Sequence, residues 1–182
     1  MRLTLAGALG AVAAAAPASA FAVDYLTVEQ AARLMFPDAD RFETRELNLD
    51  AAELQALDAQ GVRPRSARWS AQLAQHAGQP LGVVVTDDVV GKFELISYAV
   101  GIGLDGTVKQ IEILSYRESH GGEIRLPAWR RQFVGKTAAS PLRVGEDIAS
   151  ISGATLSCAH VTEGVRRLVP TVDALRRGGR LP

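Results

Sequence analysis

The pattern of apolar and polar residues predicts two short helices near the N-terminal end. Thr27-Val28-Glu29-Gln30 places a hydroxyl three residues before a glutamine, the capping-box arrangement of a helix start. This helix should end near Met35, because the residue before Pro37 disfavours helical geometry. Asp50-Ala51-Ala52-Glu53 repeats the signal in acidic form, and Gly61 stands where a helix C-terminus favours glycine.

From Ala67 onward the pattern changes to the two-residue period of a strand. Apolar residues alternate with polar neighbours at Ala67, Trp69, Ala71 and Leu73. Further runs rich in apolar residues follow at Leu81–Thr86, Phe93–Leu104 and Val108–Tyr116. Asp105-Gly106, between the last two runs, is a strong hairpin signal. Strands joined by short turns predict an antiparallel sheet.

The C-terminal third of the chain predicts two more helices. Pro127 opens a short helix that runs through Trp129 to Phe133. A last helix spans about Ser157–Val169, and Pro170 is expected to end it. The expected fold is therefore α+β, a single domain with an antiparallel sheet flanked by short helices.

The first twenty residues have the organisation of a secretory signal peptide. Arg2 precedes an apolar stretch from Leu3 to Ala16, and Ala18-Ser19-Ala20 forms a small-residue cleavage site. A membrane anchor is the weaker interpretation, because a span needs about 20 apolar residues and this stretch is shorter. Cleavage after Ala20 predicts an exported protein, located in a bacterial periplasm.

Composition and charge exclude several classes of protein. The chain has 182 residues with 20 basic and 20 acidic side chains, so its formal net charge is zero. This balance gives no electrostatic footprint for nucleic acid, and no nucleic-acid partner is expected. The lone cysteine, Cys158, excludes an intramolecular disulfide. Cys158 and His160 diverge by about 200° around a helix, so we assign no metal site.

The segment Asp147–Ser157 carries the candidate chemistry. Gly153 and Ala154 impose little bulk, so the backbone and the Thr155 hydroxyl can approach a ligand closely. A helix that begins near Ser157 turns its unpaired N–H groups toward Thr155, and its partial positive charge favours a phosphate. A plain helix cap at Thr155 or Ser157 is the alternative, and it is favoured for an isolated tetrapeptide.

Ser152-Gly153-Ala154-Thr155 resembles the flavinylation motif of the FMN-binding domain family. That family includes the covalent-flavin subunits of sodium-pumping NADH:quinone oxidoreductase and of the Rnf complex. In it, a flavin transferase joins FMN through its phosphate to the hydroxyl of the motif's threonine. The resemblance runs from about Gly82 to Val169. It includes the segments Gly91-Lys92-Phe93-Glu94, Glu118-Ser119-His120-Gly121-Gly122, and Trp129, Phe133 and Gly135-Lys136.

The resemblance implies an FMN cofactor attached through its phosphate to Thr155. It implies that three motif residues and one serine of the helix surround the phosphate: Ser152, Gly153, Ala154 and Ser157. Four residues of the glycine-rich loop are expected near the flavin ring: Glu118, His120, Gly121 and Gly122. Trp129, Phe133 and Tyr98 are candidates for stacking on the ring, with core packing as the alternative and favoured for Phe133.

One position departs from the family pattern. An acidic residue usually stands six positions before the modified threonine, and here that position is Ala149. Asp147 lies two residues earlier. Flavin binding without a covalent bond tolerates this departure more easily than recognition by the transferase does.

On this basis the chain divides into four parts. These are the signal peptide (1–20), an N-terminal helical and strand extension (21–80), an FMN-binding domain (81–170) and a C-terminal tail (171–182). The expected function is electron transfer between a membrane redox complex and another acceptor, with no catalytic residue assigned. Expected partners are the flavin transferase and membrane or periplasmic redox proteins, which would hold the protein at the inner membrane. The alternatives are a flavin-less interaction or assembly module and a reductase with noncovalent FMN.

Overall fold

A six-stranded antiparallel sheet organises the fold, with strand order β1-β6-β5-β4-β3-β2. The strands are β1 (Val23–Asp24), β2 (Arg41–Asn48), β3 (Arg68–His76), β4 (Gln79–Val90), β5 (Leu95–Gly103) and β6 (Val108–Tyr116). The structure is a computed structural model that describes residues 23–182, so the predicted signal peptide lies outside the described residues.

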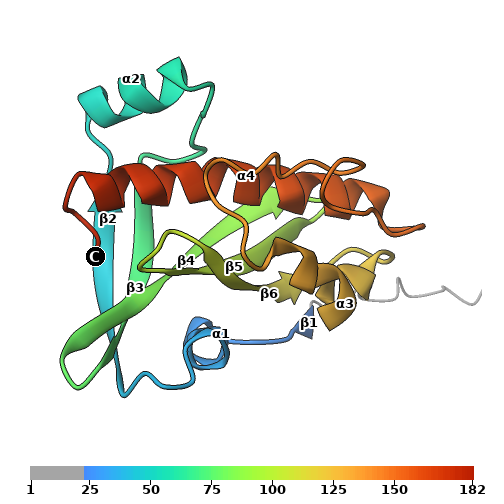
Figure 1. Cartoon of the computed structure of the whole chain (residues 1–182). Helices are drawn as coiled ribbons and strands as arrows, with labels where there is room; N and C mark the ends of the chain where they lie inside the picture. Colours follow the sequence, from blue (N-terminus) through green and yellow to red (C-terminus); the bar gives the residue numbers. More distant parts are fainter. Residues whose placement is uncertain (1–22) are drawn as a thin grey trace, which may run out of the picture.

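Helices cover both faces of this sheet (Figure 1). They are α1 (Val28–Met35), α2 (Ala51–Ala59), α3 (Pro127–Arg130) and α4 (Thr155–Arg177), with 3-10 turns at Gly122–Arg125 and Arg131–Phe133. The long helix α4 runs across one face, with α2 beside it, and α1 packs on the opposite face. Within residues 23–182 no helix combines the length and apolar character needed to cross a membrane.

Strand alternation sends apolar side chains to two separate cores. The larger core lies between the sheet and α4, where Val161, Val165 and Leu168 are buried. The smaller core lies under α1 and includes Met35 and Phe36. Because both faces are covered, the central strands β4, β5 and β6 are apolar along most of their length.

The structure confirms the expected α+β fold and both N-terminal helices. Thr27 and Gln30 form the complete capping box of α1, and Asp50 and Glu53 form that of α2. Strand β2 was not predicted, because its sequence is mostly polar or charged. It pairs with β3 over its whole length, so the partner strand fixes its conformation.

Helix α4 corrects one prediction. Pro170 does not end the helix, which begins at Thr155 and continues to Arg177. An interior proline costs a helix about 3 kcal/mol or more, since it removes one backbone hydrogen bond and crowds the preceding turn. The residues beyond it offset this cost, because Val172 and Leu175 are buried in the main core.

Strands β2 and β3 of the expected N-terminal extension belong to the same sheet as the C-terminal strands. Strand β4 spans residue 80, and it pairs with β3 on both sides of a register shift between Ala74 and Gln75. The extension therefore completes the sheet on one side.

Candidate functional site

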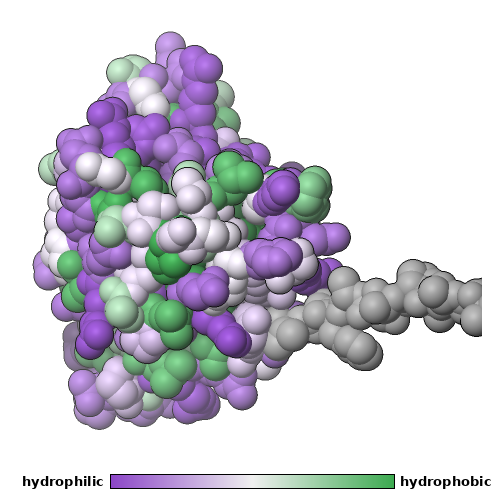
Figure 2. All heavy atoms as spheres, turned by 90° about the vertical axis from the view of Figure 1, so that its right-hand side faces the viewer, coloured by the Kyte–Doolittle hydropathy of each residue, from purple (hydrophilic) through white to green (hydrophobic). Residues whose placement is uncertain are grey.

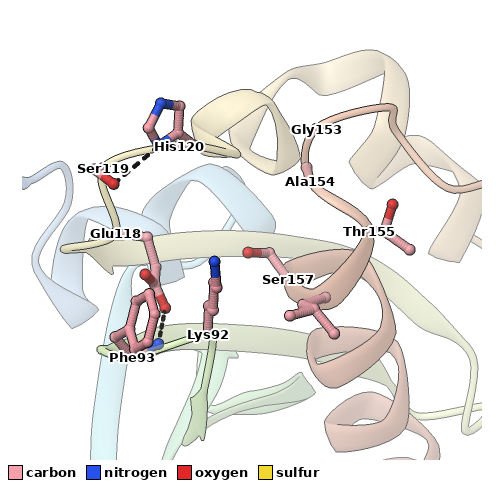
Figure 3. Close-up of a pocket in the computed structure, with 10 residues that line it drawn as sticks. Lys92, Phe93, Glu118, Ser119, His120, Gly153, Ala154, Thr155 and Ser157 are labelled. Atoms are coloured by element: carbon pink, nitrogen blue, oxygen red, sulfur yellow. Dashed lines mark hydrogen bonds between the residues drawn. The ribbon is translucent and has the colours of Figure 1, made fainter.

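A cavity of about 310 Å³ lies at the N-terminal end of α4 (Figure 3). Three segments that are distant in sequence form it: the loop between β4 and β5, the glycine-rich loop after β6, and the start of α4. The lining residues are Lys92, Phe93, Glu118, Ser119, His120, Gly153, Ala154, Thr155, Leu156 and Ser157. The sheet brings the loops together, because the β4–β5 connection and the end of β6 lie on this side.

The start of α4 carries no side-chain cap. Its N-cap residue is Ala154, which has no side-chain acceptor for the first-turn N–H groups. The plain-cap interpretation of Thr155 and Ser157 is therefore wrong. The uncapped first turn leaves a partial positive charge at the cavity wall, an arrangement that favours an anion.

The two hydroxyls at this helix start differ in accessibility. Ser157 is 5% exposed, and its Oγ lies 2.9 Å from the Tyr116 hydroxyl. Thr155 is exposed, and its hydroxyl forms no hydrogen bond within residues 23–182. In Figure 3 the two hydroxyls lie on different sides of the helix start. Thr155 thus carries the accessible hydroxyl of the pair.

The glycine-rich loop packs directly on the motif loop. Gly121 has a φ of 89°, and a Cβ there would lie 2.6 Å from Tyr116 Oη and 3.2 Å from Ala154 Cα. The Tyr116 hydroxyl also donates to the His120 carbonyl. Burial raises the pKa of Tyr116, so the phenol stays protonated at neutral pH. These contacts fix the distance between the two loops.

Glu118 holds the third segment in place. Its Oε1 accepts hydrogen bonds from the backbone N–H of Phe93 at 2.6 Å and of Glu94 at 3.0 Å. Burial opposes ionisation, but these backbone donors and the charge of Lys92 lower the pKa of Glu118. The carboxylate lies in the cavity wall, where it binds the β4–β5 loop.

This geometry can be compared with known proteins. Residues 91–169 match the family model described as the FMN-binding domain. This match assigns residues 91–169, less than half of the chain, to the FMN-binding domain. The matched region contains all three segments of the cavity wall, from Lys92 to Ser157.

The fold has a counterpart among solved structures. It resembles the crystal structure of a Na⁺-translocating NADH-quinone reductase subunit from Parabacteroides distasonis ATCC 8503. The two chains are 17% identical, the TM-score is 0.51, and the match covers 82% of each chain. At this identity the likeness shows a shared fold. The comparison with curated proteins gives no match.

The cavity of the FMN-binding domain fits a phosphate-bearing cofactor. The uncapped helix start and the Lys92 side chain both bring positive charge to it, and an exposed hydroxyl stands at its rim. In Figure 3 Lys92 rises from the β4–β5 loop toward the start of α4. Lys92, Phe93 and Leu156 were not among the sequence-predicted cofactor residues. The presence of an aromatic residue, Phe93, in a short loop could have indicated that Lys92 and Phe93 belong to the site.

Several sequence-predicted residues lie outside the cavity lining. Ser152, Gly121 and Gly122 are close to the lining segments but are not part of it. Trp129 is 3% exposed, its indole N–H donates to the Ala149 carbonyl at 2.8 Å, and its ring packs edge-on against Phe133.

The core-packing alternative therefore holds for the aromatic residues. Trp129, Phe133 and Tyr98 are all buried in the main core, and this position corrects the prediction that Trp129 stacks on the cofactor. His120 does line the cavity, and its Nδ1 lies 2.9 Å from the Ser119 hydroxyl.

Asp147 has a structural role in the loop before the motif. Its carboxylate accepts from the backbone N–H groups of Leu142 and Arg143 and lies 2.8 Å from the Lys136 ammonium. Burial opposes ionisation, but Lys136 and these backbone donors lower the pKa of Asp147. The Asp147 carboxylate is thus bound to Lys136 and to its own loop. It does not take the place of the acidic residue that the family usually has at position 149.

The residues next to the motif show no metal-binding arrangement. Cys158 is buried, and His160 Nδ1 lies 2.6 Å from the Val90 carbonyl oxygen. Within residues 23–182, no group of three or more His, Cys, Asp or Glu side chains is placed to hold a metal ion.

Proposed function

We propose that this protein is an exported electron-transfer flavoprotein whose FMN is attached through its phosphate to the Thr155 hydroxyl. One observation carries the proposal. Thr155 is an exposed hydroxyl at an uncapped helix start inside an FMN-binding domain, whereas the neighbouring Ser157 is buried and hydrogen-bonded. The helix start stabilises the phosphate of the attached group.

The attachment is a phosphoryl transfer. An Oγ–P bond forms at Thr155 while the phosphoanhydride bond of an activated flavin nucleotide breaks, and the hydroxyl proton leaves with the departing nucleotide. A flavin transferase would supply this reaction. The bound FMN supplies one- and two-electron transfer, and the chain's own residues hold and orient it.

Export and covalent attachment support one another. A signal peptide at residues 1–20 would send the protein to the periplasm, where a reversibly held cofactor could be lost. A phosphoester removes that route of loss. The fold likeness to one subunit of a Na⁺-translocating NADH-quinone reductase supports a partner in a membrane redox complex.

A second candidate is a flavoprotein with noncovalent FMN. Ala149 favours it, because the position lacks the acidic side chain typical of the family and Asp147 is engaged elsewhere. In this case the transferase would not modify Thr155, and the same cavity would hold FMN by reversible contacts.

The intact mass of the denatured protein tests both candidates. The protein is purified from its own host, or co-expressed with a flavin transferase and export machinery, beside Thr155→Ala and Thr155→Ser. We expect an increment of one FMN less one water in the wild type and in Thr155→Ser, and none in Thr155→Ala.

The other outcomes are equally distinct. An unmodified wild-type mass with free FMN in the supernatant would establish the noncovalent flavoprotein. An unmodified mass with no flavin in either fraction would contradict both candidates and leave a flavin-less interaction module. The mass also shows whether cleavage follows Ala20.

A further inference from the structure

Phe93 is the most exposed large apolar side chain among the described residues, at 75%. Single exposed apolar residues are ordinary on protein surfaces. Phe93, however, lines the cavity beside the proposed attachment site. Figure 3 shows its ring on the wall opposite the start of α4.

The backbone around Phe93 is held in one conformation. Glu118 Oε1 accepts from the N–H groups of Phe93 and Glu94, and the Gly91 N–H donates to the Glu94 carbonyl at 2.8 Å. The loop is therefore closed on itself and fastened to the glycine-rich loop. An aromatic side chain presented by such a loop is a preorganised contact surface.

A cation accompanies the aromatic ring. The Lys92 ammonium lies 4.8 Å from the centre of the Phe93 ring, and Lys92 lines the same cavity. In the part of the chain that the structure describes, no carboxylate forms a salt bridge with Lys92. Its charge lies in the same cavity as the α4 start and the Glu118 carboxylate, whose pKa it lowers.

The helix side of the cavity is apolar as well. Leu156 lines it and is 47% exposed. Figure 2 shows the face on which α4 begins, where separate apolar patches lie among polar ones. The cavity thus offers an aromatic surface, an aliphatic surface and a cation to one ligand.

We propose that the isoalloxazine ring of the flavin lies against Phe93 and Leu156, and that Lys92 favours the reduced cofactor. This inference rests on the function proposed above. A flat aromatic ligand gains both burial and stacking on such walls. Reduced flavin carries negative charge at neutral pH whereas oxidised flavin is neutral, so the ammonium stabilises the reduced form more and raises the midpoint potential.

The first test measures how firmly the ring is held. Flavin fluorescence anisotropy and iodide quenching are compared in flavin-loaded wild type, Phe93→Ala and Phe93→Tyr. Leu34→Ala, an exposed leucine of α1 on the opposite face of the sheet, is the matched control. We expect lower anisotropy and stronger quenching in Phe93→Ala only. Unchanged values in Phe93→Ala would overturn the ring contact.

The second test measures the potential, and it does not depend on loading of the Phe93 variants. The midpoint potential of Lys92→Gln is compared with that of Lys109→Gln, which removes the same charge at the opposite end of β6. We expect a more negative potential in Lys92→Gln, with a difference from wild type that shrinks at high salt. Equal potentials in wild type and Lys92→Gln would overturn the role of Lys92.

The denatured mass and the released flavin are measured on every sample first. Bound FMN with unchanged anisotropy and potential would overturn this inference and leave the proposed function intact. Absence of FMN from the wild type in both fractions would overturn the proposed function and this inference together.

Discussion

At the scale of single residues, neighbouring side chains of one type have different roles. Thr155 and Ser157 are two positions apart on α4, yet only Thr155 is exposed. Asp147 and Glu118 are both carboxylates near the motif. Glu118 accepts a hydrogen bond from the backbone of the β4–β5 loop, and Asp147 accepts one from the backbone of its own loop. The candidate site therefore depends on residues that order its loops as well as on Thr155.

Gly121 provides a test of the contact between two of these loops. Alanine there would meet Tyr116 and Ala154 in a left-handed backbone conformation. We expect Gly121→Ala to lower the free energy of unfolding by about 2–4 kcal/mol in urea titrations. The control is Gly153→Ala, which has a similar φ of 85° but no atom within 4 Å of the new Cβ. It should cost about 1 kcal/mol, and equal losses in the two variants would contradict the contact.

Glu118 is expected to make the free energy of unfolding depend on pH. Its folded-state pKa is lowered despite the opposing effect of burial, by the N–H groups of Glu94 and Phe93. A lowered pKa adds stability above the unfolded-state value of about 4.3, and this stability is lost as the pH falls through the folded-state value. We expect the stability difference between wild type and Glu118→Gln to shrink between about pH 6 and pH 3. A stability difference that does not change with pH would contradict this expectation. Glu94→Gln, which removes a neighbouring carboxylate, is the control.

At the scale of elements, α4 connects the candidate site to the core. Its first turn forms the cavity wall, and its middle packs on the sheet at Gly164, where a Cβ would lie 2.3 Å from Tyr98 Oη. Tyr98 is fully buried, and its hydroxyl donates to Asp87 at 3.2 Å. The position of the helix start thus depends on a close contact nine residues further along.

Gly164→Ala tests this contact. Alanine favours a helix by about 1 kcal/mol over glycine, but crowding against a buried side chain costs about 1–3 kcal/mol. We expect a net loss of stability in thermal or urea unfolding. The double variant with Tyr98→Phe should lose less than the sum of the single variants, because the nearest crowding atom is gone while Tyr98 Cζ at 2.9 Å and Val89 Cγ1 at 3.0 Å remain. Additive losses would show that Tyr98 Oη is not the obstacle.

At the scale of the whole molecule, the FMN-binding match begins inside the sheet. Residues 91–169 include β5 and β6 but omit β4, and they end before α4 does. Val83 and Val85 of β4 belong to the main core, as does Trp69 of β3. The matched segment therefore lacks one side of its own core.

We expect residues 91–169 alone to show no cooperative thermal unfolding, whereas residues 23–182 unfold in one transition. The shorter segment would expose an edge of β5 that β4 normally pairs, together with the apolar face beneath α4. Circular dichroism during heating makes the comparison. A cooperative transition in the short segment would show that the N-terminal strands are dispensable.

The sequence by itself determined the local elements and the candidate chemistry. Capping boxes, the Asp105-Gly106 hairpin and strand alternation depend on neighbouring residues, and they predicted α1, α2 and the antiparallel strands. The resemblance of Ser152-Gly153-Ala154-Thr155 to a flavinylation motif predicted an FMN-binding domain, which the family match confirms. The signal peptide and the covalent attachment of FMN to Thr155 remain predictions.

Only the tertiary structure decided which residues surround the site. Trp129 and Phe93 are both aromatic residues of the matched region. Burial and contacts across the sheet nevertheless placed Trp129 in the core and Phe93 in the cavity wall. The same tertiary contacts stabilise α4 beyond Pro170, and pairing with β3 gives the charged segment of β2 its strand conformation. Local pattern fails in these cases because the deciding interactions join residues far apart along the chain.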